Sequence, residues 1–415
     1  MNTIVRKSLF LTSLLILGQF SIAQLDTVRL FMFGHSLMDH RPPLISTPSD
    51  ETTIAHWMSI LADAANNEFS ATGEFGFMGS HAANLPPDSQ WGYDTVQTSW
   101  DASTTPLSQA NIDQVMLTPL NYVQWQAANI NYQNSIFSPL SASRTVMDYM
   151  AVQLPDSPRM YIYEHWPDMS SVLGGGSFPP NATQLANFHL NTQGSHHTWF
   201  LEFQDSLVAS RPAIDVKMIP VGPVLTQILT RSPYNAIPVT ELYEDDAPHG
   251  RASLYFLAGL VTYMGLYEEK APSSYIPPTI VHSTIRNNYN TIVDLMWAQL
   301  QNFNYPNGES RVFFGANLIP LVIDDDVPGT ADETSPSFHI YPNPSNSGMF
   351  RIDLPNGEAP QELVVYNMNG QVVYHLSKEA LGNNDAVQVG DLPKGIYNIQ
   401  VQGIRGVYTA RLVLD

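Results

Sequence analysis

The sequence contains no cysteine, which excludes disulfide bonds, thiolate nucleophiles and cysteine metal ligands together. Basic residues are also scarce: 18 Lys and Arg stand against 38 Asp and Glu, and the formal net charge is −20. So few cations cannot neutralise a phosphate backbone, so nucleic acid is not an expected partner. The same charge disfavours adhesion to an anionic membrane surface. A neutral, polar or weakly cationic ligand is easier to accommodate.

Long apolar runs are lacking except at the N-terminus. There Arg6 and Lys7 precede a mostly apolar stretch, Ser8–Phe20, and Ser21-Ile22-Ala23 places small residues where a signal peptidase reads them. This pattern predicts a signal peptide over residues 1–23. The alternative, a membrane anchor, is disfavoured because the apolar core is shorter than the ~20 residues that span a bilayer. We therefore expect a secreted protein with no membrane span in the mature chain.

With 415 residues, the chain is long enough for two domains. In residues 24–322, short apolar runs alternate with segments of helical apolar spacing, which predicts an α/β domain with a parallel sheet covered on both faces. Sites in such sheets form beyond the carboxyl ends of the strands. We expect strands at Thr27–Phe33, Glu68–Phe77, Asp113–Leu117, Arg159–Tyr163 and Asp215–Val221, helices at Ile54–Ala65, Ala142–Leu154, His197–Ser210, Arg251–Tyr267 and Asn290–Gln301, and a strand pair in Val312–Ile323.

The residues after 322 differ from the α/β region in composition and in hydrophobic pattern. Residues 323–337 are acidic, polar and rich in small residues and proline, which is typical of a linker. Short alternating strands follow over residues 338–415, and Asn369-Gly370 between two of them is a hairpin turn signal. These features predict a small all-β sandwich without a cluster of potentially catalytic groups.

A candidate nucleophile follows the first strand of the α/β region. The strand fixes the backbone, Gly34 permits a sharp turn, and Ser36 is then displayed at the start of the next segment. The alternative is a buried strand that ends in an ordinary turn. A nucleophilic serine also requires a base, an acid that orients the base, and an oxyanion site.

The loop before Arg251 supplies a candidate base. Asp246 and His249 are three residues apart, so the carboxylate can fold back and accept the Nδ1 proton, leaving Nε2 for the serine proton. Pro248 stiffens this loop. Asp245 is the competing acid, and an acidic helix-capping loop with an incidental histidine is the structural alternative.

These two blocks carry a family resemblance. Gly34-His35-Ser36-Leu37 and Asp246-Ala247-Pro248-His249, in this order, resemble the first and last blocks of an SGNH (GDSL-type) hydrolase. The resemblance implies a flavodoxin-like three-layer α/β/α fold and ester hydrolysis through an acyl-serine intermediate. It implies that Ser36 is the nucleophile, His249 the general base and acid, and Asp246 the orienting carboxylate, with no cofactor and no metal.

The resemblance also implies an oxyanion hole, here only partly matched. The N–H of Ser36 supplies one donor, and Gly79 in Phe77-Met78-Gly79-Ser80 is the nearest match to the family's second block. The third block, Gly-x-Asn-Asp, is missing. In this chain, the strand Arg159–Tyr163 leads into the position of that block. The indole N–H of Trp166, just after the strand, is the expected substitute donor.

Three further residues are expected to line the site. His35 stands where the family usually has Asp. His165 is an alternative donor beside Trp166, and Asn84 is a donor from another part of the chain. Loss of one oxyanion donor typically costs roughly 10²–10³ in rate, so the gap is serious without being fatal.

The tail resembles a second family over nearly all of Phe338–Asp415. Tyr341-Pro342-Asn343-Pro344, Val364–Val373 and Leu392-Pro393-Lys394-Gly395-Ile396-Tyr397 are similar to the C-terminal sorting domain of the type IX (Por) secretion system. The resemblance implies the secretion machinery as a partner, export through the outer membrane, and release or surface attachment. The alternative is a carbohydrate-binding β-sandwich.

Together these features predict a secreted or outer-membrane-surface serine esterase. Because the protein is expected to be exported, we expect a polymer-derived substrate, first acetyl or other short acyl esters on carbohydrate and second a lipid or simple ester. The alternative from another class is a surface glycan-binding protein on a catalytically decayed SGNH fold.

Overall fold

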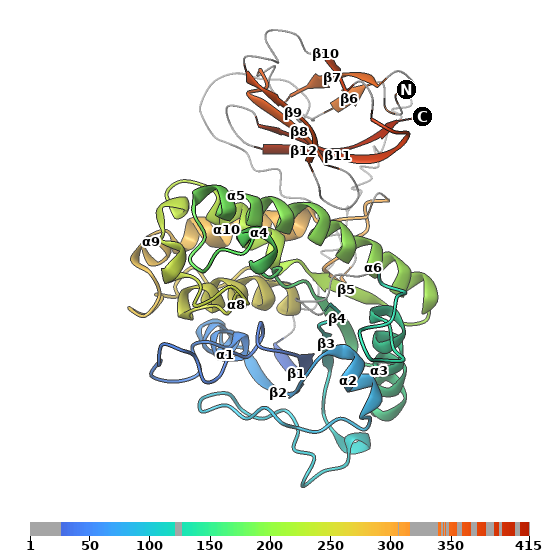
Figure 1. Cartoon of the computed structure of the whole chain (residues 1–415). Coiled ribbons are helices and arrows are strands. Elements are labelled where there is room, and N and C mark those ends of the chain that lie inside the picture. Colours follow the sequence, from blue (N-terminus) through green and yellow to red (C-terminus); the bar gives the residue numbers. More distant parts are fainter. Residues whose placement is uncertain are drawn as a thin grey trace, which may run out of the picture.

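The computed structural model describes two regions of the chain (Figure 1). The predicted signal peptide and the predicted linker lie outside the described residues. The described residues are 26–120, 127–305, 307–315, 339–341, 343, 345, 348–354, 359–366, 372–378, 386–389, 392–402 and 407–414.

Five parallel strands form the central sheet of the first region, in the order β2-β1-β3-β4-β5. This confirms the predicted parallel sheet, and the order is that of flavodoxin-like doubly wound sheets. The chain crosses from one side of β1 to the other, so loops after β1 and β3 meet at the carboxyl edge. The strands are β1 Thr27–Gly34, β2 Glu68–Phe75, β3 Gln114–Leu117, β4 Arg159–Tyr163 and β5 Val216–Ile219.

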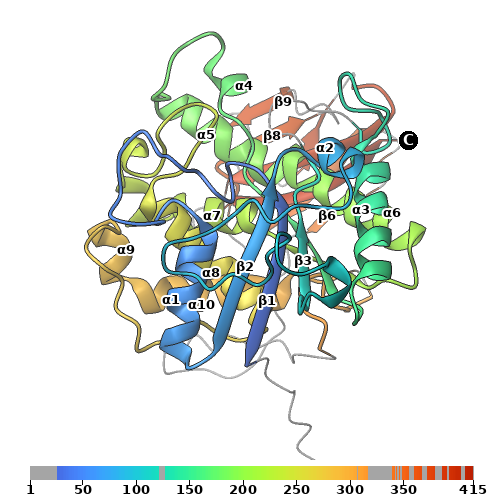
Figure 2. The same cartoon turned by 90° about the horizontal axis from the view of Figure 1, so that it is seen from below.

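Helices cover both faces of this sheet (Figure 2). Alternate residues of β1 enter two separate cores: Leu30 and Met32 pack with α1, α7, α8 and α10, whereas Phe31 and Phe33 pack with α2, α3 and α6. This alternation is the period of two that a strand buried on both faces requires. The helices are α1 Ile54–Ala65, α2 Met78–Ala83, α3 Pro139–Gln153, α4 Ser170–Leu173, α5 Ala182–Asn191, α6 His197–Ser210, α7 Val221–Leu229, α8 Ala252–Tyr267, α9 Ser283–Asn287 and α10 Tyr289–Asn302, with a π-helical turn over Thr192–His196.

Helix α8 is the most deeply placed helix, because all 16 of its residues are buried. It packs against α1 so closely that a Cβ on Gly259 would lie 2.6 Å from the Cβ of Trp57. A helix buried all round must find partners for its polar side chains. The hydroxyl of Tyr255 has the carbonyl of Ser36 as its hydrogen-bond partner.

Several elements differ from the prediction: the helix predicted over Ala142–Leu154 spans Pro139–Gln153, and α4, α5, α7 and α9 were not predicted. The second strand ends at Phe75, where its partner β1 ends, and the residues that follow form α2 instead of extending the strand. The fifth strand ends at Ile219, and Gly222-Pro223 lies in the first turn of α7, where proline is tolerated. The predicted strand pair in Val312–Ile323 is wrong in its described part, because residues 312–315 form no strand.

The C-terminal region is all-β, as predicted. Two antiparallel sheets, β10-β7-β6 and β12-β11-β8-β9, share one core to which Phe350, Val365, Ile399 and Leu412 contribute. In the part of the chain that the structure describes, no helix has the length and apolar character needed to cross a membrane. The strands are β6 His339–Tyr341, β7 Met349–Asp353, β8 Glu362–Tyr366, β9 Val372–Ser377, β10 Ala386–Gln388, β11 Gly395–Gln402 and β12 Val407–Leu414.

Candidate active site

Ser36 lies in a tight turn at the carboxyl edge of the sheet, directly after β1. The carbonyl of His35 accepts a hydrogen bond from Met38 N–H at 2.9 Å, which closes the turn. Gly34 packs closely against two side chains here, because a Cβ would lie 2.2 Å from the sulfur of Met38 and 3.1 Å from Oγ1 of Thr118. The hydroxyl of Tyr255, on α8, donates a hydrogen bond to the carbonyl of Ser36 and so fixes the position of the turn. Ser36 itself remains partly exposed.

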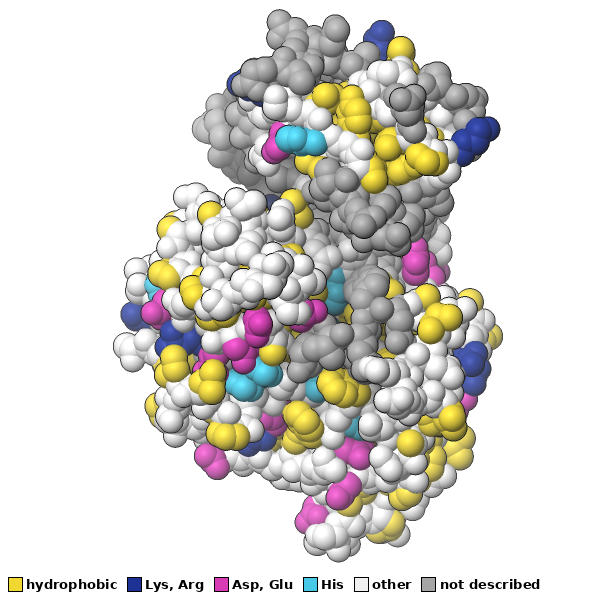
Figure 3. Space-filling model, in the orientation of Figure 1, with side chains coloured by type: hydrophobic (Ala, Val, Ile, Leu, Met, Phe, Trp, Pro, Cys, Tyr) yellow, Lys and Arg dark blue, Asp and Glu magenta, His cyan; other side chains and the backbone are white. Residues whose placement is uncertain are grey.

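His249 lies against this serine, although 213 residues separate them in the chain. Its Nε2 is 2.9 Å from Ser36 Oγ, and its Nδ1 is 2.7 Å from Oδ2 of Asp245. An ionised carboxylate only accepts hydrogen bonds, so Nδ1 carries the proton. In the neutral ring, Nε2 then accepts the hydrogen bond from the Ser36 hydroxyl. In the view of Figure 3, histidine side chains lie at the surface of the first region, next to acidic side chains.

The acid that contacts His249 is Asp245, so the prediction of Asp246 is wrong. The loop is a narrow hairpin in which Glu244 N–H donates to the carbonyl of His249 at 2.8 Å. Asp245 opens the turn, and its Oδ1 accepts the N–H groups of Ala247 at 3.1 Å and His249 at 2.9 Å. This Asx-type turn directs the second oxygen at the ring. Asp246 follows at the tip, where its carbonyl accepts Met169 N–H.

The charge on Asp245 is stabilised by the same contacts. Partial burial raises the pKa of this carboxyl, but the hydrogen bond from the His249 ring, the backbone N–H groups of His249 and Ala247, and the attraction of the imidazolium outweigh it. The net effect lowers the pKa below its ordinary value. Asp245 is therefore an anion at neutral pH.

Trp166 anchors the His249 loop and is not placed to donate into the site. Its indole N–H donates to the carbonyl of Pro248 at 2.9 Å, and the side chain is fully buried. The predicted oxyanion role of Trp166 is therefore wrong, because its only donor is already used. Its ring also contacts Tyr255 edge-on, with 6.1 Å between centroids. Trp166 and Tyr255 thus connect the His249 loop to the Ser36 turn.

Two other predicted contributors lie elsewhere. His165 is fully buried, and its ring nitrogens are 2.6 Å from the carbonyl of Trp166 and 3.0 Å from that of Leu120, so it does not line an accessible site. Asn84 ends helix α2, where its amide donates to the carbonyl of Ser80 at 2.9 Å. His165 is thus unavailable as the missing oxyanion donor, and Asn84 is held at the end of α2 with one of its two amide hydrogens used within the helix.

His35 forms the floor of the Ser36 turn. It is buried between the rings of Phe77 and His165, with centroid distances of 5.4 and 5.2 Å. Its Nδ1 accepts Leu37 N–H at 3.3 Å, a bond that an aspartate at this position could also accept. Burial, and next the neighbouring His165, lower its pKa well below the ordinary value, so the ring is neutral. His35 supports the turn rather than meeting a ligand.

Two backbone donors remain for an oxyanion. Among the described residues, no acceptor takes the N–H of Ser36. Gly79 lies in the first turn of α2, where N–H groups lack intrahelical acceptors. The Phe77–His35 contact places the start of this helix beside the Ser36 turn. A side chain at Gly79 would collide with Tyr132, because its Cβ would lie 2.9 Å from that ring.

A second histidine–carboxylate pair, absent from the sequence predictions, stacks on the first. The ring of His40 lies parallel to that of His249, with 4.1 Å between centroids and 4° between planes. Its Nε2 is 3.0 Å from Oε2 of Glu244. The same carboxylate accepts the N–H of Leu44 at Oε2 and that of Ile45 at Oε1. The only sequence signal was the proximity of His40 to Ser36 and of Glu244 to His249.

The C-terminal residues can be assigned by comparison. Residues 339–415 match the family described as the secretion system C-terminal sorting domain. The tail is a sorting domain. This confirms the resemblance noted in the sequence, and a sorting domain implies secretion or a cell-surface location with the secretion machinery as partner. No curated protein matches the chain.

Among solved structures, the chain is similar to a DUF4886 family protein from Bacteroides uniformis, at 12% identity and a TM-score of 0.42, over 69% of this chain and 98% of that one. Two others are an engineered protein (9% identity, TM-score 0.18) and a Cellulomonas fimi endo-β-1,4-mannanase double mutant (10%, 0.20). Each covers 93% of this chain and 86% of the other. These TM-scores are below 0.5 and carry no argument about activity.

Proposed function

We propose that the α/β region is a serine ester hydrolase of the SGNH type, exported by means of the sorting domain. The observation that carries the proposal is the unbroken contact from Ser36 Oγ through His249 to Asp245, at 2.9 and 2.7 Å. A hydroxyl, an imidazole and a carboxylate in this order form the arrangement that activates serine. Its position at the carboxyl edge of a parallel sheet, where such folds bind ligands, adds support.

The first half of the reaction forms an acyl-enzyme. Ser36 Oγ attacks the ester carbonyl carbon while its proton passes to Nε2 of His249, and the carbonyl oxygen becomes an oxyanion. The anionic Asp245 stabilises the imidazolium. The bond to the alkoxy oxygen then breaks, and Nε2 returns the proton to the departing alcohol.

Deacylation repeats the sequence with water. His249 removes a proton from water, the hydroxide oxygen attacks the acyl carbon, and the bond to Ser36 Oγ breaks as that oxygen regains a proton from His249. In both halves, the N–H groups of Ser36 and Gly79 are the proposed donors to the oxyanion. Two donors instead of three predict a modest turnover rate, since each donor is worth roughly 10²–10³.

We propose short acyl esters on carbohydrate as the first substrates to test. The acidic chain disfavours anionic polymers, whereas an acetylated neutral glycan meets no repulsion. Lipid and simple esters are the second class.

Hydrolysis of p-nitrophenyl acetate by the purified protein, compared with Ser36→Ala, tests the proposal. We expect measurable turnover for the wild type and a loss on the order of 10⁴-fold or more for the variant. Equal inactivity of both proteins, across acyl lengths and acetylated glycans, would overturn the enzyme assignment. The glycan-binding alternative would then be favoured, because the missing third oxyanion donor is the feature expected of a decayed hydrolase.

A further inference from the structure

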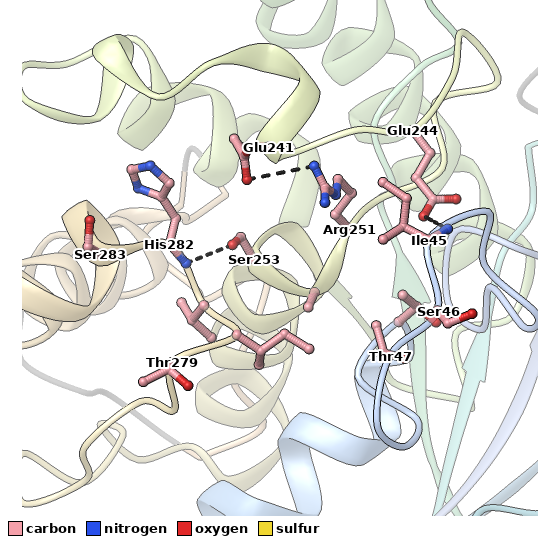
Figure 4. Close-up of a pocket in the computed structure, with 14 residues that line it drawn as sticks. Ile45, Ser46, Thr47, Glu241, Glu244, Arg251, Ser253, Thr279, His282 and Ser283 are labelled. Carbon is pink, nitrogen blue, oxygen red and sulfur yellow. Dashed lines mark hydrogen bonds and ion pairs between the residues drawn. The ribbon is translucent and has the colours of Figure 1, made fainter.

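A pocket of about 310 Å³ lies beside the proposed catalytic group and takes no part in the mechanism above (Figure 4). Its walls come from the loop that follows the Ser36 turn, the segment before the His249 hairpin, the start of α8 and the chain leading into α9. Its volume is at the lower end of the range for small-ligand sites. The residues that line it are Ile45, Ser46, Thr47, Thr52, Glu241, Glu244, Arg251, Ala252, Ser253, Thr279, Ile280, Val281, His282 and Ser283.

The pocket is joined to Ser36 by a short series of contacts. Glu244 forms part of its wall and accepts from His40 at 3.0 Å, and His40 stacks on His249 at 4.1 Å. Arg251, another wall residue, follows His249 by two positions in the chain. A molecule held here would therefore lie next to the residues that contact His249.

The charges of the pocket disfavour an anion. Arg251 is its only Lys or Arg, and two carboxylates, Glu241 and Glu244, stand against it. Both carboxylate oxygens of Glu244 already accept hydrogen bonds, and its side chain is 1% exposed. Glu244 therefore adds negative charge to the wall, but neither oxygen is accessible to a ligand. The Arg251–Glu241 pair is loose, at 3.6 Å, and Glu241 is 51% exposed. A hydroxyl both donates and accepts, so a diol can bridge this pair.

The remaining wall is divided between hydroxyls and aliphatic groups. Figure 4 shows Ser46, Thr279 and Ser283 around the pocket, with the ring of His282 opposite Arg251. His282 Nδ1 accepts Thr284 N–H at 3.2 Å, so in the neutral ring Nε2 carries the hydrogen and donates. Ile45 and Ile280 add aliphatic side chains to the same lining, and Val281 is fully buried behind it.

From this combination we propose that the pocket binds one neutral, hydroxyl-rich ring, a sugar unit of the alcohol part of the substrate. Polar groups that both donate and accept would hold the hydroxyls, and the side chains of Ile45 and Ile280 would contact C–H groups of the ring. The size favours one sugar unit over a longer segment. This inference rests on the proposed function for its link to catalysis, but binding can be measured without it.

The test measures binding to the full chain carrying Ser36→Ala, so that no probe is consumed. Calorimetry with methyl β-xylopyranoside is expected to show saturable binding in the millimolar range, and methyl β-glucuronide, its anionic counterpart, at least tenfold weaker binding. Thr279→Trp fills the pocket mouth from an exposed position and is expected to weaken binding of the neutral sugar at least tenfold. Ser274→Trp, exposed on the same segment and outside the pocket, is the matched control and is expected to bind as the parent does.

A second variant removes one polar group without filling space. Glu241→Ala is expected to weaken sugar binding at least fivefold. No binding of the neutral sugar, or equal binding by the Thr279→Trp and Ser274→Trp proteins, would overturn the subsite. The proposed function fails separately: if p-nitrophenyl acetate is not hydrolysed by the wild type but the sugar binds in the pocket, the esterase is rejected and the subsite stands.

Discussion

Replacing Asp245 with asparagine should reduce turnover far more than replacing Asp246. In the structure, Asp245 accepts three hydrogen bonds, one from the His249 ring at 2.7 Å and two from backbone N–H groups. An asparagine can keep its oxygen on the backbone pair, but its NH₂ then faces Nδ1. The ring must take the other tautomer, with the proton on Nε2, and can no longer accept the Ser36 proton. We expect kcat to fall on the order of 10³–10⁴-fold, equivalent to about 4–5.5 kcal/mol.

The matched control is Asp246→Asn, which removes the same charge one residue along the same hairpin. Its kcat for p-nitrophenyl acetate should stay within about threefold of the wild type, because its contact with Met169 uses the backbone carbonyl. Both variants should retain their thermal unfolding midpoint within a few degrees, which separates catalysis from folding. If Asp246→Asn loses a thousandfold and Asp245→Asn does not, the assigned acid is wrong.

Three further predictions concern the surroundings of the site. Trp166→Phe keeps the ring but leaves the carbonyl of Pro248 without its donor, so kcat should fall roughly 10- to 100-fold with a smaller change in KM, measured by steady-state hydrolysis. Tyr255→Phe removes the donor to the carbonyl of Ser36 and should lower the free energy of unfolding by about 1–3 kcal/mol in urea titrations. His189 is buried, and burial lowers its pKa from the ordinary 6.5 to about 4, so the unfolded chain binds the proton more readily. Stability from this residue is present above pH 6.5 and falls by about 3 kcal/mol as the pH drops to 4, and His189→Gln should remove that part of the slope.

Much of the fold was predictable because its signals are local. The helices Ile54–Ala65 and His197–Ser210 and the strand Arg159–Tyr163 have the predicted bounds, since their apolar spacing and flanking residues are unambiguous. Helix α7 was not predicted, because Gly222-Pro223 at its start has the composition of a turn. In the structure, this glycine is needed for packing, since a Cβ would lie 2.7 Å from the carbonyl of His165. Such a tertiary cause leaves no local pattern.

The candidate site likewise has features that the sequence predicted and features that it did not. The pairing of Ser36 with His249 was predicted from the spacing in the His249 loop and from the resemblance of two blocks, in order, to one family. The choice between Asp245 and Asp246 depended on a hairpin turn that spacing alone does not specify. Trp166 was given the wrong role because its sequence position says nothing of the carbonyl that its N–H meets. The pairing of His40 with Glu244 and its stacking on His249 were not predicted, because ring stacking joins residues without a motif.

The most direct test of the central claim is covalent labelling of the serine. A fluorophosphonate probe reacts with a hydroxyl only when a neighbouring base activates it. After incubation with the wild-type protein, peptide mass spectrometry should find one phosphonylated residue, Ser36, at close to one label per chain. His249→Ala should show no label under the same conditions. Absence of label on the folded wild type, or labelling of Ser36 to the same extent without His249, would contradict the account.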